Sequence, residues 1–208
     1  MTLIKICGIT NLEDALSSIS AGADALGFNF YKRSPRYIEP NKAREIIQQL
    51  PHTVLNVGVF VNENTTEEVA RIADQVKLNA VQLHGEESPS YCAELKSFNV
   101  IKAFRVSDDF KPEDVLKFDV SAVLLDAYSR DARGGTGKVF DWGVAKETQK
   151  IFPKVFLAGG LTPDNVADAI RQIKPYAVDA CSSLEIARGK KDAGKIKAFV
   201  NAVFETKA

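Results

Sequence analysis

Eight short apolar runs, rich in Val, Ile, Leu and Phe, alternate along the 208-residue chain with longer amphipathic stretches. This alternation predicts parallel strands joined by crossover helices, because two parallel neighbours can be connected only by a long excursion over one face of the sheet. The runs that we interpret as strands cover residues 3–7, 25–30, 54–61, 80–84, 100–105, 122–126, 155–158 and 176–180. Eight strand and helix units leave about 26 residues for each unit, near the lower end of what a (β/α)8 barrel needs.

The fold that we predict from this pattern is α/β: a (β/α)8 TIM barrel that forms a single domain over residues 1–208. An open, doubly wound sheet is the alternative that shares the pattern. No low-complexity segment or linker interrupts the series. The longest irregular stretches, residues 31–39 and 127–140, directly follow predicted strands, where a barrel builds its active site.

Several of the expected helices carry recognisable start signals. A capping-box spacing, or a hydroxyl residue before a proline, satisfies the free N–H groups of a first helical turn. Such signals are Thr10 with Glu13, Thr65 with Glu68, Ser88-Pro89 and Thr162-Pro163. Pro40 after Glu39 and Asp141 before Trp142 indicate two further starts, and the connection after the fifth strand carries the weakest helix signal.

Composition excludes several classes of function. Lys plus Arg and Asp plus Glu both number 27, so we expect no nucleic-acid or membrane partner, and any anionic ligand must be bound by local groups. The three cysteines are widely spaced without a C-x-x-C pair, which favours a reducing compartment. With only two histidines, and with no apolar run approaching about 20 residues, we expect no metal site and a cytoplasmic protein.

Polar residues interrupt strands that should be apolar on both faces. Side chains alternate along a strand, so Lys5 and Cys7 share one face of the first strand while Ile4 and Ile6 share the other. The apolar face suits the helices, which directs Lys5 and Cys7 into the barrel. The same argument assigns further polar side chains to the interior: Asn29, Asn56, Gln82, His84, Lys102 and Asp126. We therefore predict a polar pocket at the C-terminal ends of the strands, with Cys7, His84 and Asp126 on its rim.

Each of these residues also has an ordinary structural interpretation. A free cysteine such as Cys7 often behaves as a small buried hydrophobe, and Asp126 can cap a loop. His84 and Gln82 can be hydrogen-bonded structural residues, and a buried lysine needs only a carboxylate partner. The argument for function is that several such residues converge on one rim.

Nine short motifs in order along the chain carry a resemblance to a known family. They are residues 5–10 (KICGIT), 25–30 (ALGFNF), 34–38 (SPRYI), 57–62 (VGVFVN), 81–86 (VQLHGE), 124–126 (LLD), 134–138 (GGTGK), 158–161 (AGGL) and 189–192 (GKKD). Together they resemble the phosphoribosylanthranilate isomerase family over nearly the whole chain. Most of them lie beside a predicted strand end, where a barrel enzyme keeps its functional residues.

The resemblance implies an Amadori rearrangement in tryptophan biosynthesis, in which N-(5-phosphoribosyl)anthranilate becomes an aminoketose. An acid protonates the ribose ring oxygen to open the ring, and a base then removes the C2 proton. The family's base matches Cys7 and its acid matches Asp126. We add the hypothesis that Lys5, two residues away on the same predicted face, favours the thiolate form of Cys7. Proton transfers alone suffice, so no cofactor or metal is implied.

The resemblance also implies substrate-binding residues. Arg36 matches the residue that binds the anthranilate carboxylate, a role suited to a bidentate guanidinium. The phosphate is expected at the loops after the seventh and eighth strands, where barrels often hold this group on backbone N–H groups. The residues concerned are Gly159, Gly160, Ser182 and Ser183, and we add Gln82 and His84 as further substrate contacts.

The chain departs from the family pattern after the eighth strand. The family shows Val-Asp-Val-Ser-Ser-Gly there, whereas this chain has Cys181 in place of a serine and Ser183 in place of the glycine. If the glycine is needed for a positive φ, the geometry of the phosphate site must shift. Residues 134–138 are not a nucleotide P-loop, because Ala132 and Val139 occupy two required positions. We interpret them as a mobile loop that closes over the substrate.

Two other functions remain open at this point. The related isomerase of histidine biosynthesis shares the fold, but it has an aspartate in the position of Cys7 and two phosphate half-sites. A non-catalytic barrel that binds a phosphorylated metabolite is the second alternative. We expect a small phosphorylated molecule as ligand in each case, and a monomer or a homodimer as the assembly.

Overall fold

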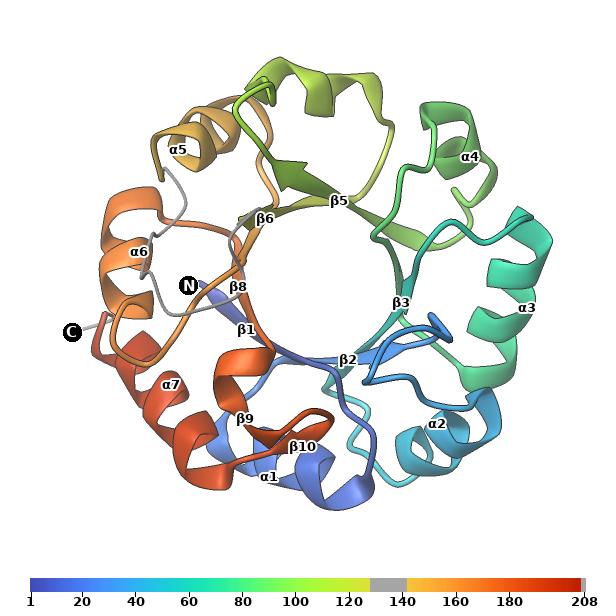
Figure 1. The fold of residues 1–208 in the computed structure, drawn as a ribbon, viewed down its shortest axis with the longest axis vertical. Coiled ribbons are helices and arrows are strands. Elements are labelled where there is room, and N and C mark those ends of the chain that lie inside the picture. The colour runs from blue at the N-terminus through green and yellow to red at the C-terminus, as the bar shows by residue number, and fades with distance from the viewer. Residues whose placement is uncertain (128–141, 207–208) are drawn as a thin grey trace.

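Eight strands of the computed structural model, which describes residues 1–127 and 142–206, pair in parallel and close into a barrel (Figure 1). In chain order they are β1 (Leu3–Cys7), β2 (Ala25–Asn29), β3 (Leu55–Phe60), β4 (Ala80–Leu83), β5 (Asn99–Val106), β6 (Ala122–Ala127), β7 (Val155–Ala158) and β8 (Ala177–Ala180). The pairing of β8 with β1 closes the ring, so the predicted TIM barrel is confirmed and the open sheet is wrong. Each strand end lies at most one residue from its predicted position.

Helices surround the strands on the outside of the barrel (Figure 1). They are α1 (Leu12–Ala21), α2 (Pro40–Ile47), α3 (Thr66–Val76), α4 (Pro89–Glu94), α5 (Trp142–Ile151), α6 (Val166–Ile173) and α7 (Ala193–Glu205). After β5 the connection is a 3-10 helix, η1 (Pro112–Lys117), where the helix signal in the sequence was weakest. A second one, η2 (Ser182–Leu184), and the hairpin of β9 (Glu185–Ala187) and β10 (Lys190–Lys191) separate β8 from α7.

Three of the predicted helix starts are confirmed. The Thr65 hydroxyl caps α3 by accepting a hydrogen bond from the Glu68 N–H at 3.2 Å. The Ser88 hydroxyl caps α4 in the same way, and Pro40 occupies the first turn of α2. Each of these ends therefore satisfies or removes an N–H group that would otherwise lack an intrahelical acceptor. Asp141, the predicted cap of α5, lies outside the described residues.

Two predicted starts are wrong, that of α1 by one residue and that of α6 by three. Helix α1 is capped by Asn11, whose side chain accepts from the Asp14 N–H at 2.8 Å, because the Thr10 hydroxyl is engaged by the Gly189 carbonyl. Helix α6 begins at Val166 rather than after Thr162. The Thr162 hydroxyl instead accepts from the Asp164 N–H in a turn that precedes the helix.

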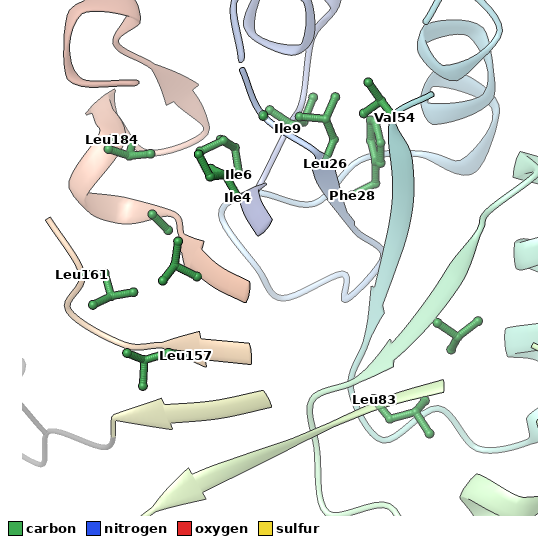
Figure 2. Packing of buried hydrophobic residues seen from close by; sticks show 14 of the residues in the cluster. Ile4, Ile6, Ile9, Leu26, Phe28, Val54, Leu83, Leu157, Leu161 and Leu184 are labelled. Atoms are coloured by element: carbon green, nitrogen blue, oxygen red, sulfur yellow. The ribbon is translucent and has the colours of Figure 1, made fainter. Parts of the chain in front are cut away.

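Two apolar layers hold the barrel together. The larger one fills the space between strands and helices, and it contains Ile4, Ile6 and Leu83 (Figure 2). The smaller one fills the barrel interior with residues such as Ala122 and Leu124. The alternation predicted for β1, β4 and β6 is therefore confirmed. It leaves the inward-facing Cys7, Gln82 and Asp126 above the apolar floor.

Asn56 and Lys102 do not face the interior, contrary to prediction. Their strand neighbours Val57 and Ile101 belong to the inner layer, so Asn56 and Lys102 face the helices. The Lys102 ammonium is buried there, 2.8 Å from the Glu87 carboxylate, and it also donates to the Gly85 carbonyl at 2.6 Å. The buried ammonium therefore has its counter-charge, the Glu87 carboxylate, on the outer side of the strands.

Candidate active site

A cavity of about 770 Å³ opens at the C-terminal ends of the strands. This volume suits a small phosphorylated molecule, since ligand pockets generally measure about 300–1,000 Å³. All nine residues that the sequence singled out for the site line this cavity: Cys7, Arg36, Gln82, His84, Asp126, Gly159, Gly160, Ser182 and Ser183. Residues that are up to 176 positions apart in the sequence therefore meet in one pocket.

Cys7 is the last residue of β1, and its thiol lies against the backbone of β2. A Cβ atom at Gly27 would stand 2.6 Å from the Cys7 sulfur, so the absence of a side chain at Gly27 gives the sulfur its place. Below it on the same face, the fully buried Lys5 ammonium lies 3.0 Å from the Asp179 carboxylate of β8. The pair Ile6 and Ala180 is in register, so Cys7 at the end of β1 and Cys181 directly after β8 follow it side by side.

The surroundings of Cys7 favour its thiolate. The neighbouring Cys181 thiol, as hydrogen-bond donor, is the largest influence that lowers the pKa of Cys7. Burial works in the opposite direction, and the positive charges of Lys5 and Lys191 lower the pKa further. In return, the hydrogen bond to Cys7 and burial raise the pKa of Cys181. The surroundings therefore favour the ionised form at Cys7 and the protonated form at Cys181.

The Lys5–Asp179 ion pair lies under this thiolate. Burial is the largest single influence on Lys5 and opposes its charge, but Asp179 and Cys7 together outweigh it, and the pKa of Lys5 is raised. Burial also raises the pKa of Asp179 to about 7, in spite of the attraction of Lys5. Lys5 lowers the pKa of Cys7 less than Cys181 does, in the direction of the effect that we predicted.

Gln82, His84 and Asp126 form a hydrogen-bonded chain across the mouth of the barrel. The Gln82 amide nitrogen lies 2.8 Å from His84 Nδ1, and His84 Nε2 lies 3.2 Å from Asp126 Oδ2. If the amide donates to Nδ1, the ring proton is on Nε2 and points at the carboxylate. The Asp126 side chain remains one-third exposed to the cavity, so a ligand can reach it.

Arg36 reaches the cavity from the loop after β2. Its aliphatic stem passes over Gly8, where a Cβ would come within 2.7 Å of the arginine Cδ. The guanidinium binds the Glu185 carboxylate with two hydrogen bonds of 2.7 Å each. This pairing raises the pKa of Arg36 and fixes the plane of its head group.

The loops after β7 and β8 form the opposite wall. Gly159 and Gly160 have φ angles of 80° and 71°, which favour glycine, and a Cβ at Gly160 would meet nothing within 4 Å. Ser182 and Ser183 lie in η2. Among the described non-glycine residues, positive φ occurs at Asn62, Lys77 and Lys174 and not at Ser183. A serine therefore occupies this position without backbone strain, and its hydroxyl donates to the Leu161 carbonyl.

The cavity also contains residues to which no sequence motif assigned a role. Asp179 is the buried partner of Lys5, and Asn29 was predicted to face inward without a function. Arg105 lies beside Asp126 in register and shares a strand face with Ile101 and Ala103. Strand alternation was a sufficient signal for Asp179, which shares the inward face of Ala177, whereas the wrong inward assignment of Lys102 placed Arg105 on the helix side.

Other features bear on the class of site. Within residues 1–127 and 142–206, no three His, Cys, Asp or Glu side chains are grouped so as to hold a metal ion. Nor does that part of the chain contain a helix with the length and apolar character needed to cross a bilayer. The loop at residues 134–138, which we predicted to close over the substrate, lies outside the described residues.

Comparison with known proteins relates the site to one family. Residues 4–202 match the family model of N-(5'-phosphoribosyl)anthranilate (PRA) isomerase. An N-(5'-phosphoribosyl)anthranilate isomerase of Trichlorobacter lovleyi is 51% identical over 200 residues, which are 96% of this chain and 97% of that protein. The crystal structure of phosphoribosyl anthranilate isomerase from Thermotoga maritima is similar with a TM-score of 0.88 at 45% identity, and the match covers 99% of this chain and 100% of that one. Another structure of this enzyme type contains reduced 1-(o-carboxyphenylamino)-1-deoxyribulose 5-phosphate. It is 42% identical with a TM-score of 0.85, and the match covers 99% of this chain and 100% of that one.

Proposed function

Because this chain belongs to the N-(5'-phosphoribosyl)anthranilate isomerase family, it is an isomerase, and we propose that its substrate is N-(5-phosphoribosyl)anthranilate. The product is 1-(2-carboxyphenylamino)-1-deoxyribulose 5-phosphate, an intermediate of tryptophan biosynthesis. The observation that carries the proposal is that the Cys7 thiol, whose pKa is lowered by its neighbours, and the Asp126 carboxyl group open into the same cavity. An aldose–ketose rearrangement needs one base and one acid on a common substrate.

Asp126 is the general acid in this proposal. It gives a proton to the ribose ring oxygen, so that the C1–O bond breaks and a protonated Schiff base forms. His84 orients the carboxyl group through its 3.2 Å hydrogen bond, and Gln82 in turn orients the ring of His84.

Cys7 is the general base. Its thiolate removes the proton from C2 of the Schiff base, and the resulting enolamine becomes the aminoketose when a proton is added at C1 and the C2 hydroxyl proton is lost. The Cys181 hydrogen bond and the positive charges of Lys5 and Lys191 maintain the thiolate before the substrate arrives. Proton transfer by a positioned base of this kind contributes roughly a hundred- to ten-thousand-fold to a rate.

The two ends of the substrate are bound by different walls of the cavity. We assign the anthranilate carboxylate to Arg36, whose guanidinium presents N–H groups in a fixed plane. We assign the phosphate to backbone N–H groups at Gly159, Gly160, Ser182 and Ser183. The hydroxyl of Ser183 is already donated to Leu161, so this residue contributes its backbone group.

An assay with two substrates and two variants tests the proposal. The purified protein is expected to convert N-(5-phosphoribosyl)anthranilate and not the aminoaldose of histidine biosynthesis. Cys7→Ser and Asp126→Asn should each lower kcat by roughly a hundred- to ten-thousand-fold while a product analogue still binds. Matched controls are Cys92→Ala, a buried thiol on α4, and Asp168→Asn, an exposed carboxylate on α6. Unchanged rates in both site variants would refute the assigned roles.

The location of the protein is a further part of the proposal. All three cysteines, Cys7, Cys92 and Cys181, are free thiols. Because a catalytic thiolate is readily oxidised, a reducing compartment preserves the activity, and we place the protein in the cytoplasm on that ground. Recovery of the protein from a cell fraction in which Cys7 is oxidised would contradict this placement.

A further inference from the structure

We propose that Glu185 is a positioning residue for substrate recognition, holding the Arg36 guanidinium over the cavity so that its remaining N–H groups face the aromatic carboxylate of the substrate. This inference rests on the proposed function, because it takes Arg36 as the group that binds that carboxylate. It adds a residue, remote in sequence, whose contact is with Arg36 and not with the substrate.

The contact between the two side chains is a two-point ion pair. Arg36 Nε donates to Glu185 Oε1 and Nη2 donates to Oε2, each at 2.7 Å. Such a fork fixes both the position and the plane of the guanidinium. It uses two of the five N–H groups of the arginine, and both of these lie on one edge of the guanidinium. Three N–H groups remain for a ligand, and Arg36 lines the cavity from which the ligand would approach.

Glu185 is itself immobilised. Its side chain is 5% exposed, and Oε1 also accepts from the Lys191 ammonium at 3.2 Å and from the Gly189 N–H at 3.3 Å. Its backbone carbonyl accepts from Lys195 at 2.9 Å. The carboxylate thus belongs to the first residue of β9, which is held at several points, as an anchor for a flexible side chain requires.

Charge explains why this carboxylate does not cancel the attraction of Arg36 for an anion. Burial acts against the ionised form of Glu185, but Arg36 and Lys191 together lower its pKa. The buried Lys191 shares the negative charge, so the cluster of Arg36, Lys191 and Glu185 carries one net positive charge. That charge lies beside the cavity and remains available to a substrate carboxylate.

The stem of Arg36 is constrained as well. It crosses Gly8, whose φ of 80° and lack of a Cβ leave room for the arginine Cδ. The head group is therefore fixed by Glu185 and the stem by the turn after β1. A side chain with three or four free torsions would otherwise lose conformational entropy each time that a ligand bound.

A comparison of two substrates tests the role of Glu185. The first is N-(5-phosphoribosyl)anthranilate, and the second is N-(5-phosphoribosyl)aniline, which lacks the carboxylate. For Glu185→Gln we expect KM for the first substrate to rise about tenfold, as for one weakened charge-assisted hydrogen bond, with kcat changed less than about twofold. The KM for the second substrate should stay within about twofold of the wild-type value. Arg36→Met should abolish the preference for the substrate that carries the carboxylate. In the double variant, Glu185→Gln should then cause no further rise in KM.

Controls separate positioning from a structural role. Asp168→Asn removes the carboxylate from an exposed Arg171–Asp168 pair on α6 and should leave both substrates unaffected. Glu185→Asp keeps the charge on a shorter stem, and its smaller selective rise in KM decides the question if Glu185→Gln does not fold. An equal rise in KM for both substrates, or no rise for either, would overturn the inference. Wild-type protein that turned over both substrates equally well would overturn it too, whereas absence of any turnover would refute the proposed function itself.

Discussion

A single sulfur atom, that of Cys7, has its charge set by three neighbours from distant parts of the chain. Cys181 on the adjacent strand end donates a hydrogen bond, and the ammonium groups of Lys5 and Lys191 attract the thiolate. Lys191 also lies 3.7 Å from the Cys181 sulfur, so the donor is itself held in place. Other charged groups that border the sulfur are Arg36 and Asp179. Among these influences the hydrogen bond is the largest that favours the anion, which makes Cys181 the residue to change.

For Cys181→Ala we therefore expect the pKa of Cys7 to rise. With the donor absent, the thiolate loses its main stabilising contact and burial acts against it. The low-pH limb of kcat/KM should move to higher pH, and alkylation of Cys7 by iodoacetamide should require a higher pH as well. Mass spectrometry distinguishes Cys7 from the other thiols. Cys181→Ser keeps a donor and should restore most of the effect, whereas an identical alkylation profile in all variants would contradict the prediction.

Among the secondary-structure elements, β1 and β8 form the seam at which the barrel closes. Lys5 and Asp179 face each other across it, in register and buried, with the ammonium and carboxylate 3.0 Å apart. Removal of one partner leaves an uncompensated charge in the interior, so we expect Lys5→Met to lower the free energy of unfolding by about 3–5 kcal/mol. Urea unfolding at constant pH measures this loss.

The double variant and the pH dependence provide the control for the seam. Asp179→Asn in the Lys5→Met background removes the orphaned charge and should recover part of the stability. In the single variant the Asp179 carboxyl group, whose pKa is already raised to about 7, loses its cation, so the folded state binds its proton more strongly. Stability should then fall as the pH rises from the ordinary aspartate pKa through this window, because the folded state holds more protons than the unfolded state. Equal stability of the single and double variants would contradict the prediction.

Strand alternation explains how much of the fold and of the site the sequence could predict. It assigned the inward faces of β1, β4 and β6 correctly, because polar and apolar residues there alternate without a break. It failed at Asn56 and Lys102, since a polar residue on an otherwise apolar strand can find its partner on either side. Glu87 on the following loop decides the orientation of Lys102, and no local pattern reveals that contact.

Contacts between distant segments were beyond the reach of the sequence for a different reason. The two-point pairing of Arg36 with Glu185 joins residues 149 positions apart, and it depends on how the hairpin after β8 folds back against the turn that follows β1. Family motifs located Arg36, but the hairpin has no helical or strand period that would predict its path. The Cys7–Cys181 contact likewise follows only from the closing register of the barrel.

At the scale of the whole molecule, the closed ring couples the two ends of the chain. Strand β8 pairs with β1, and α7 near the C-terminus packs against α1 near the N-terminus (Figure 1). The outer apolar layer runs continuously between the strands and this ring of helices. Separation of any strand from its neighbours would therefore open the barrel and expose both apolar layers. This favours unfolding of the barrel as a single cooperative unit.

We accordingly expect urea to unfold the protein in one transition, as the prediction of a single domain requires. Trp142, the one tryptophan of the sequence, begins α5 and packs against the outer layer, so its fluorescence reports that part of the fold, whereas far-UV circular dichroism reports every helix. The two signals should change at the same urea concentration.

A product analogue at about 100 times its Kd should raise the free energy of unfolding by about 2.7 kcal/mol and move both midpoints together. This follows because Cys7 and Asp126 belong to β1 and β6, so the ligand contacts both halves of the ring. Separate midpoints, or a ligand shift in only one of the signals, would show that the barrel consists of two independently unfolding parts.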